Sequence, residues 1–275
     1  MLDLTPTNVL NGLDTHIPQT VRCFPQVNST MDLCREALQQ EPDSHFPLLI
    51  VADEQTAGRG RQGRRWEAPP SSALLFSLAF RPPRLPFANA PRCVWMASVA
   101  IAEGIAAACG VTPSLKWPND ILLPAPKDES YGGPWRKIAG ILLEASSNFA
   151  EVDWAIIGCG INLSAAPPSK ATRLPASHLS RYTANLDRVE LLRDILRRFD
   201  AWYPALSGDD SALFSAWRDR LITIGHDVAI NTPNGVIHGR AEAVDRAGNL
   251  LVRGSSGVLQ TITSGDVDLV GVRRA

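Results

Sequence analysis

The stretch from Asp53 to Trp66 carries the densest set of residues in this sequence that could bind an anion. It reads DEQTAGRGRQGRRW, and its second half interleaves four arginines with three glycines. Such a loop lets the backbone approach a ligand closely while the side chains supply fixed positive charge. The apolar runs Pro47–Ala52 and Ala73–Phe80 on either side predict two buried strands. We therefore predict an anion-binding loop held between two core strands.

The glycines of this loop also fit the pattern GxGxxG of dinucleotide-binding sites. That pattern requires a helix that starts at the glycines and an acidic residue about twenty positions later. The residues from Trp66 to Pro70, WEAPP, cannot open such a helix, and no Asp or Glu lies between Glu67 and Glu103. The dinucleotide interpretation is therefore excluded. The remaining alternative to an anion-binding loop is a solvated, arginine-rich surface turn.

A second group of polar residues interrupts an apolar strand at SLKWPNDILL, residues 114–123. Pro118 breaks the strand, and the kink places Lys116, Asn119 and Asp120 at one point of the sheet. Arginine outnumbers lysine 23 to 4 in this chain, so Lys116 and Lys137 in apolar surroundings are informative. The alternative is an ordinary turn at Asn119 with Lys116 as a strand residue whose charged end reaches solvent.

A helix N-terminus offers a third candidate position. The strand Thr20–Val27 is followed by a helix that runs to about Gln40, and Ser29 or Thr30 can cap it. The same hydroxyl groups could instead hold a polar ligand. The remaining predicted elements are an apolar core helix at Arg92–Cys109 closed by Gly110, core strands at Arg136–Ala145 and Val152–Leu163, and helices at Asp187–Trp202 and Asp209–Leu221.

Two irregular segments and a change of pattern divide the chain. Pro124–Trp135 reads as a mobile insertion and Ser164–Ser177 as a loop. From Ile222 onward, short strands alternate with turns at residues 233–235, 247–249 and 254–257, which is typical of a small β-barrel. We therefore predict a domain at residues 1–222 and a second domain at residues 223–275.

Composition narrows the class of protein. The chain has 275 residues, 45% of them hydrophobic, and a net charge of −1, which indicates a globular protein and argues against a basic nucleic-acid binder. Five cysteines without a CxxC pair and scattered histidines indicate free thiols and no dedicated metal site. The N-terminus lacks a basic signal sequence, and no uninterrupted apolar run approaches the length of a membrane span. We expect a cytoplasmic protein with no membrane partner.

Taken together in their order along the chain, these motifs resemble the biotin protein ligases. The matching segments cover most of the chain: residues 28–30 (NST), 54–61 (EQTAGRGR), Trp66, 116–120 (KWPND), 137–144 (KIAGILLE) and 158–162 (GCGIN). Two features depart from the family pattern, namely Gln62 in place of a further arginine and the length of the Pro124–Trp135 insertion. Neither affects a residue to which the resemblance gives a role.

The resemblance implies an α+β fold, with a catalytic domain like that of class II aminoacyl-tRNA synthetases followed by a small SH3-like β-barrel. It implies that biotin and ATP, the latter with Mg²⁺, form biotinyl-5′-AMP, and that biotin then passes to a lysine of a biotin carboxyl carrier protein. No tightly bound metal and no nucleic acid are expected, and the state is expected to be monomer or homodimer. Too few residues precede Ser29 for a DNA-binding domain, so a monofunctional ligase is expected.

The resemblance also implies roles for individual residues. Lys116 and Arg61 are expected to be catalytic. Residues expected to contact biotin or its adenylate are Ser29, Thr30, Met31, Gln55, Gly58, Arg59, Gly60, Arg61, Lys116, Gly140 and Gly158. Residues expected on the nucleotide side are Arg61, Arg64, Trp66, Asn119 and Asn162. Two rival functions are a lipoate or octanoyl ligase of the same superfamily and a non-enzymatic module that binds RNA or DNA phosphates through the arginine loop.

Overall fold

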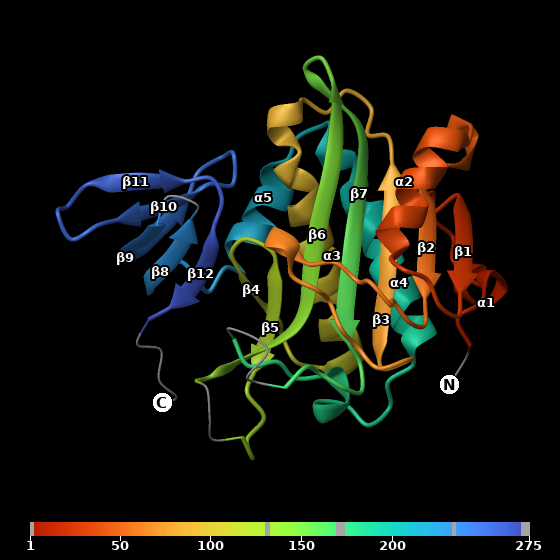
Figure 1. The fold of residues 1–275 in the computed structure, drawn as a ribbon, viewed down its shortest axis with the longest axis horizontal. Helices are drawn as coiled ribbons and strands as arrows, with labels where there is room; N and C mark the ends of the chain where they lie inside the picture. The colour runs from red at the N-terminus through yellow and green to blue at the C-terminus, as the bar shows by residue number, and fades with distance from the viewer. Residues whose placement is uncertain (1–2, 130–132, 169–173, 233–234, 271–275) are drawn as a thin grey trace.

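A computed structural model describes residues 3–129, 133–168, 174–232 and 235–270 (Figure 1). Within them, the larger sheet has seven strands in the spatial order β1-β2-β3-β7-β6-β5-β4. β1 and β2 are parallel, and the other neighbours are antiparallel. The strands are β1 (Thr20–Phe24), β2 (Leu48–Ala52), β3 (Ala73–Phe80), β4 (Ser114–Lys116), β5 (Asp120–Pro124), β6 (Trp135–Asn148) and β7 (Glu151–Asn162).

Helices cover both faces of this sheet (Figure 1). The helix α2 (Thr30–Gln40) packs on one face against β2, β3 and β7. The helix α3 (Pro91–Cys109) packs on the other face and is itself covered by α4 (Arg188–Trp202) and α5 (Ser211–Arg218). The predicted α+β class with a mixed sheet is therefore confirmed.

The central helix α3 is apolar nearly all round, as a helix enclosed by other elements must be. The segment Phe87–Cys109 is long and apolar enough to cross a membrane by length and composition alone, but 61% of its most apolar 18-residue stretch is buried inside the protein. Glu103 interrupts the apolar run of this segment, in agreement with the expectation that no uninterrupted apolar run reaches the length of a membrane span. Burial between the sheet and α4 accounts for its composition.

The C-terminal end of α3 has the predicted capping glycine, whereas the predicted side-chain cap of α2 by Ser29 does not form. Gly110 adopts the left-handed conformation, with φ of 66°, and its N–H donates to the carbonyl of Ala106 at the end of α3. At the start of α4, the carboxylate of Asp187 accepts from the N–H groups of Val189 and Glu190. The helix predicted at Asp209–Leu221 is shorter, because only Ser211–Arg218 is helical.

The N-terminal segment contains a short helix, α1 (Pro6–Leu10), that the sequence did not predict. Val9 and Ile17 are buried in the main core. The carboxylate of Asp200 on α4 accepts from the N–H groups of His16 and Ile17, each at 3.0 Å. The segment is thus an integral part of the domain.

The polar kink has the predicted form. β4 ends at Lys116, the Trp117–Pro118 peptide bond is cis, and β5 begins at Asp120, which pairs directly with Lys116 across the antiparallel ladder. Trp117 contacts the C-terminal part of the chain: its N–H donates to Thr223 Oγ1, and its Nε1 donates to the carbonyl of Gly248, both at 2.9 Å.

The second sheet lies in the part of the chain coloured blue in Figure 1. It contains, within the described ranges, five antiparallel strands in the order β11-β10-β9-β8-β12. They are β8 (Asp227–Thr232), β9 (Gly235–Val244), β10 (Leu250–Arg253), β11 (Leu259–Ile262) and β12 (Asp266–Leu269). The predicted change to short strands is confirmed, and glycines with positive φ lie in two of the predicted turns, at Gly248 and Gly257. The turn at residues 233–234 lies outside the described residues, and the SH3-like closure and the boundary after residue 222 stay predictions.

Candidate functional site

A cavity of about 280 Å³ lies beside α2, between the 53–66 loop, the middle of β6 and β7, and the β4–β5 kink. The predicted residues that line it are Ser29, Thr30, Met31, Gln55, Arg59, Gly60, Arg61, Arg64, Trp66, Lys116, Asn119, Gly140, Gly158 and Asn162. These residues come from the loop, the kink, α2 and three strands, so the fold brings the motifs together as predicted.

Gly58 is predicted at the site but does not line the cavity within the described residues. Its carbonyl accepts from the N–H of Trp66 at 3.0 Å. A Cβ atom at this position would lie 2.5 Å from the carbonyl oxygen of Trp66. Gly58 therefore allows the two ends of the loop to pack closely, and it positions Trp66 through the backbone.

Hydroxyl and amide groups from α2, the loop and β3 gather at one end of the cavity. Gln55 Oε1 accepts from the backbone N–H of Thr30 at 2.8 Å and from Thr30 Oγ1 at 3.1 Å, and Thr30 Oγ1 lies 2.7 Å from Ser77 Oγ. Ser29 begins α2, but its hydroxyl does not cap the helix. Ser29 Oγ is buried and has no hydrogen-bond partner among the described residues. Because burying an unpaired hydroxyl costs free energy, this atom is available to a polar ligand.

Glycines form the floor of the cavity. Gly140 on β6 pairs with Gly160 on β7, and Leu142 pairs with Gly158. A Cβ at Gly158 would lie 2.6 Å from Met31 Sδ, and a Cβ at Gly160 would lie 2.4 Å from Trp66 Cε2. Only glycine lets these two large side chains lie directly on the sheet.

The opposite end carries two more polar atoms for which the described residues offer no hydrogen-bond partner, Trp66 Nε1 and Asn162 Oδ1. The amide nitrogen of Asn162 donates to the carbonyl of Ser177 at 3.0 Å, which fixes the side chain. Its oxygen therefore points in a defined direction. A buried donor and a buried acceptor at this end match the needs of a polar ring system.

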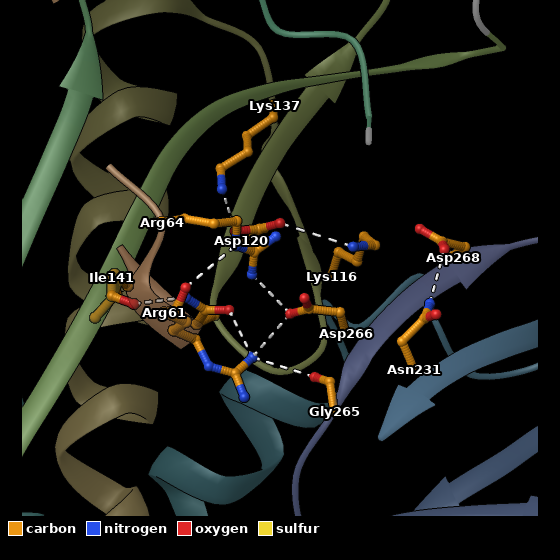
Figure 2. A network of polar contacts seen from close by, with 11 residues as sticks. Arg61, Arg64, Lys116, Asp120, Lys137, Ile141, Asn231, Gly265, Asp266 and Asp268 are labelled. Atoms are coloured by element: carbon orange, nitrogen blue, oxygen red, sulfur yellow. Dashed lines mark hydrogen bonds and ion pairs between the residues drawn. The ribbon is translucent and has the colours of Figure 1, made fainter. Parts of the chain in front are cut away.

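Three of the four loop arginines separate into one anchor, Arg59, and two residues that reach the C-terminal part of the chain, Arg61 and Arg64. Arg59 Nη2 lies 3.1 Å from Asp32 on α2, and its Nη1 lies 3.0 Å from Glu144 on β6. Arg61 donates to Asn119 Oδ1 at 3.3 Å and to the carbonyl of Gly265 at 3.2 Å. Arg64 Nη2 lies 2.8 Å from Asp266 at the start of β12 (Figure 2). Burial lowers the pKa of the Arg61 guanidinium, which Asp266 partly counteracts.

Two lysines flank one carboxylate at the kink (Figure 2). Asp120 Oδ1 lies 2.6 Å from Lys137 Nζ, and Asp120 Oδ2 lies 3.7 Å from Lys116 Nζ. Burial alone would raise the pKa of Asp120, but the two ammonium groups lower it overall. Burial lowers the pKa of Lys116, and Asp120 opposes that effect. Lys116 is only 8% exposed, so its charged end does not reach solvent as the alternative interpretation required.

Asp120, Lys137 and Asp266 are among the cavity residues that received no role from the sequence. Asp120 and Lys137 belong to the matched motifs, and their proximity could have been inferred had the pairing of β5 with β6 been known. Asp266 gave no sequence signal, because its contacts with the arginine loop depend on docking of the second sheet. Over the described ranges, no group of three or more His, Cys, Asp or Glu side chains could hold a metal ion.

Comparison with known proteins matches both parts of the chain. Residues 23–162 match the Biotin/lipoate A/B protein ligase family, and residues 223–270 match the Biotin protein ligase C terminal domain. The Biotin–[acetyl-CoA-carboxylase] ligase of Paracoccus denitrificans is 33% identical over 229 residues, which cover 81% of this chain and 90% of that protein. The Bifunctional ligase/repressor BirA of Bacillus spizizenii is 32% identical over 272 residues, 97% of this chain and 79% of the relative. The chain spans 66% of the BirA protein of Bacillus subtilis, at 32% identity.

Solved structures agree on the fold. The biotin protein ligase from Aquifex aeolicus in complex with biotin and ATP superposes with a TM-score of 0.71 at 24% identity, covering 94% of this chain and 100% of that chain. The Leishmania major enzyme in complex with biotinyl-5-AMP superposes with a TM-score of 0.59 at 20% identity, covering 90% of this chain and 100% of that one. With two matched domains in order and relatives at more than 30% identity over most of the sequence, the chain belongs to the biotin protein ligase family.

Proposed function

We infer that this chain is an ATP-dependent biotin protein ligase that acts in two steps. In the first, an oxygen of the biotin carboxylate bonds to the α-phosphorus of ATP, and the bond from that phosphorus to pyrophosphate breaks. In the second, a lysine amine of a biotin carboxyl carrier protein attacks the acyl carbon of biotinyl-5′-AMP, forming an amide and releasing AMP. The observation that carries this proposal is one cavity, in a chain of this family, that is lined by cations and by buried polar atoms without a hydrogen-bond partner among the described residues.

The end near Ser29 suits the ureido group of biotin. Ser29 Oγ and the Thr30–Gln55 pair offer a hydroxyl and an amide at this end of the cavity. Met31 on Gly158 supplies an apolar surface for the fused rings. We propose that these residues, with Gly60 and Gly140 along the cavity wall, bind biotin.

The end near Trp66 suits the adenosine of ATP. Its indole lies on Gly160 and Gly140, and Nε1 and Asn162 Oδ1 can pair with a polar ring. Arg61 and Arg64 also line the cavity and can pair with phosphate oxygens. Asn119 is already occupied, since it donates to the carbonyl of Ile141 at 2.6 Å and accepts from Arg61. We therefore propose that Asn119 positions Arg61.

Between the two ends, the kink can stabilise the developing negative charge. No protein nucleophile is required, because the biotin carboxylate attacks phosphorus itself. Lys116, Lys137 and Arg61 line the cavity and supply cations that are already in place before reaction. Mg²⁺ enters with ATP as part of the substrate, and we propose no resident metal. Arg59, which is paired with Asp32 and Glu144, acts mainly by anchoring the loop.

We further propose a cytoplasmic enzyme that works as a monomer or homodimer on a carrier domain of a biotin-dependent carboxylase, without a nucleic-acid or membrane partner. The net charge of −1 and the reduced cysteines support this proposal. The match of residues 223–270 to the biotin-specific C-terminal domain favours biotin over lipoate.

Biotin-dependent exchange of labelled pyrophosphate into ATP tests the proposal directly. The purified chain should catalyse exchange with biotin and not with lipoate or octanoate at equal concentration. Labelled biotin should then appear in an isolated carrier domain, and a carrier domain that lacks its acceptor lysine serves as the control. Exchange with lipoate alone, or no exchange with either acid, would refute the assignment.

A further inference from the structure

The insertion between β5 and β6 remains without a role in the reaction. Its described part is tied to the body of the domain rather than projecting freely. The hydroxyl of Tyr182 donates to the carbonyl of Pro124 at 2.8 Å, and Arg181 Nη2 lies 2.5 Å from Asp128. The next residue, Glu129, reaches inward to Arg136, at the second position of β6.

Arg136 is an arginine with no exposed surface. Its Nε donates to Glu129 Oε2 at 2.5 Å, and its Nη1 donates to the carbonyls of Gly133 at 3.0 Å and Trp135 at 2.9 Å. A guanidinium this deeply buried is tolerable only while its charge is balanced, so the carboxylate of Glu129 fixes where the side chain sits.

The neighbour of Arg136 is Lys137, one of the two lysines beside Asp120. Its backbone is held on the outer side by the segment 175–177: the N–H of Lys137 donates to the carbonyl of Pro175 at 2.9 Å, and its carbonyl accepts from the N–H of Ser177 at 3.0 Å. The carbonyl of Ser177 also holds Asn162. The segment 175–177 therefore supports two residues of the cavity, Lys137 and Asn162.

An irregularity in the ladder directs Lys137 into the cavity. Ile121 on β5 pairs with Ala139, but the next residue, Leu122, pairs with Lys137, so that Ile138 is an extra residue on β6. In a regular strand, positions 137 and 140 would face opposite sides of the sheet. Here a Cβ on Gly140 would lie 3.3 Å from Lys137 Nζ, so both face the cavity. Bulges of this kind re-aim a side chain and locally interrupt the ladder of hydrogen bonds.

We propose that Glu129 is a positioning residue for adenylation. By neutralising Arg136, Glu129 fixes the strand residue directly before the β6 bulge, and this holds Lys137 in place. The Lys137 ammonium group then lies 2.6 Å from the Asp120 carboxylate and 5.7 Å from the centroid of the Trp66 ring. This inference rests on the proposed function, because it assigns Glu129 an effect on the formation of biotinyl-AMP.

The test is a double-mutant cycle on the single-turnover rate of biotinyl-AMP formation by the full chain. Glu129→Gln should lower that rate by about 10- to 100-fold, the cost of a misplaced reacting group. It should leave the affinity for biotin within twofold, since the biotin end lies elsewhere. In a Lys137→Met background, Glu129→Gln should cause less than a twofold further loss, because the residue it positions is already gone. Glu129→Asp, which keeps the charge, should recover part of the rate.

Asp128→Asn is the matched control, because it removes the neighbouring carboxylate of the same insertion, which is exposed and paired with Arg181. It should leave the rate within twofold of the parent. An unchanged rate in Glu129→Gln, or an equal loss in both backgrounds, would overturn the inference. If Glu129→Gln does not fold, Glu129→Asp is measured in both backgrounds with the same criterion. A parent that makes no biotinyl-AMP rejects the proposed function itself, whereas an active parent with an unaffected Glu129 variant rejects this inference alone.

Discussion

Asp120 Oδ1 lies 2.6 Å from Lys137 Nζ, and the carboxylate is 15% exposed. The other oxygen is shared with Lys116, so one negative charge separates two ammonium groups in the cavity. Without it, the two lysines would repel each other in a site that already disfavours charge.

Asp120→Asn should therefore weaken both stability and activity. Removing one partner of a buried ion pair costs about 3 kcal/mol, at the low end of the usual range because Lys137 keeps a quarter of its side chain exposed. Urea denaturation measures the loss, and adenylation should fall with it because the lysines lose their fixed positions. Asp128→Asn, an exposed carboxylate, serves as control. An Asp120→Asn protein with parental stability would show that the lysines do not depend on this carboxylate.

Lys116→Met should lower the single-turnover rate of adenylation by about 10²–10³, the typical loss when one preorganised charge is removed. The melting temperature should change little, because methionine conserves most of the volume of a side chain that is only 8% exposed and because Lys137 still pairs with Asp120. Lys127→Met, on the exposed insertion, is the control. A parental rate, or loss of folding, would refute a catalytic role.

Substitution of two glycines on β7 should affect the two substrates differently, because each glycine lies under a different side chain of the cavity. Gly160→Ala places a methyl group 2.4 Å from the Trp66 ring, which cannot move without leaving the sheet, so KM for ATP should rise by about tenfold. Gly158→Ala meets Met31 Sδ at 2.6 Å, and that flexible side chain can yield, so the smaller effect should fall on KM for biotin. Pyrophosphate exchange at varied ATP and varied biotin distinguishes the two. Equal effects on both substrates in both variants would contradict the assignment of the ends.

The pair of Glu41 with Arg22 should make stability depend on pH in the acid range. Hydrogen bonds from Arg22 and His45 lower the pKa of Glu41 from 4.5 to about 2. A lowered carboxyl pKa means that its stabilisation is complete above pH 4.5 and is lost as the pH falls toward 2. The melting temperature of Glu41→Gln should thus lie below that of the parent at neutral pH, with a gap that closes in acid. A gap independent of pH would exclude this pair as its source.

Elements defined by strong local patterns were predicted closely from the sequence. The strand Ala73–Phe80 and the glycine that ends α3, Gly110, occur at the predicted residues. Both are local signals, because an unbroken apolar run favours a buried strand and a glycine favours the left-handed helix end. The helix α1 was missed, since five residues with one buried side chain carry no periodicity. β6 extends to Asn148, beyond the predicted Ala145, because its last residues are polar and are held by pairing with β7.

Contacts in the site could be predicted where both partners belong to one sequence motif. They could not be predicted where the partners come together only when distant elements pack against each other. Lys116 and Asp120 pair across a tight kink that Pro118 predicts in the sequence. The contacts of Arg61 and Arg64 with Asp266 join positions about 200 residues apart, and no local pattern encodes them. The anchoring of Arg59 by Asp32 and Glu144 likewise depends on how α2 packs on the sheet.

Trp117 donates hydrogen bonds to Thr223 and Gly248, which belong to the C-terminal part of the chain. Its two neighbours in the sequence, Lys116 and Pro118, line the cavity. Asp266 and Val267 of that sheet also line the cavity. Docking of the small sheet and binding of a ligand therefore share one free-energy cycle. By reciprocity, whatever a ligand in the cavity adds to the stability of the docked sheet, docking of the sheet adds to the affinity for that ligand.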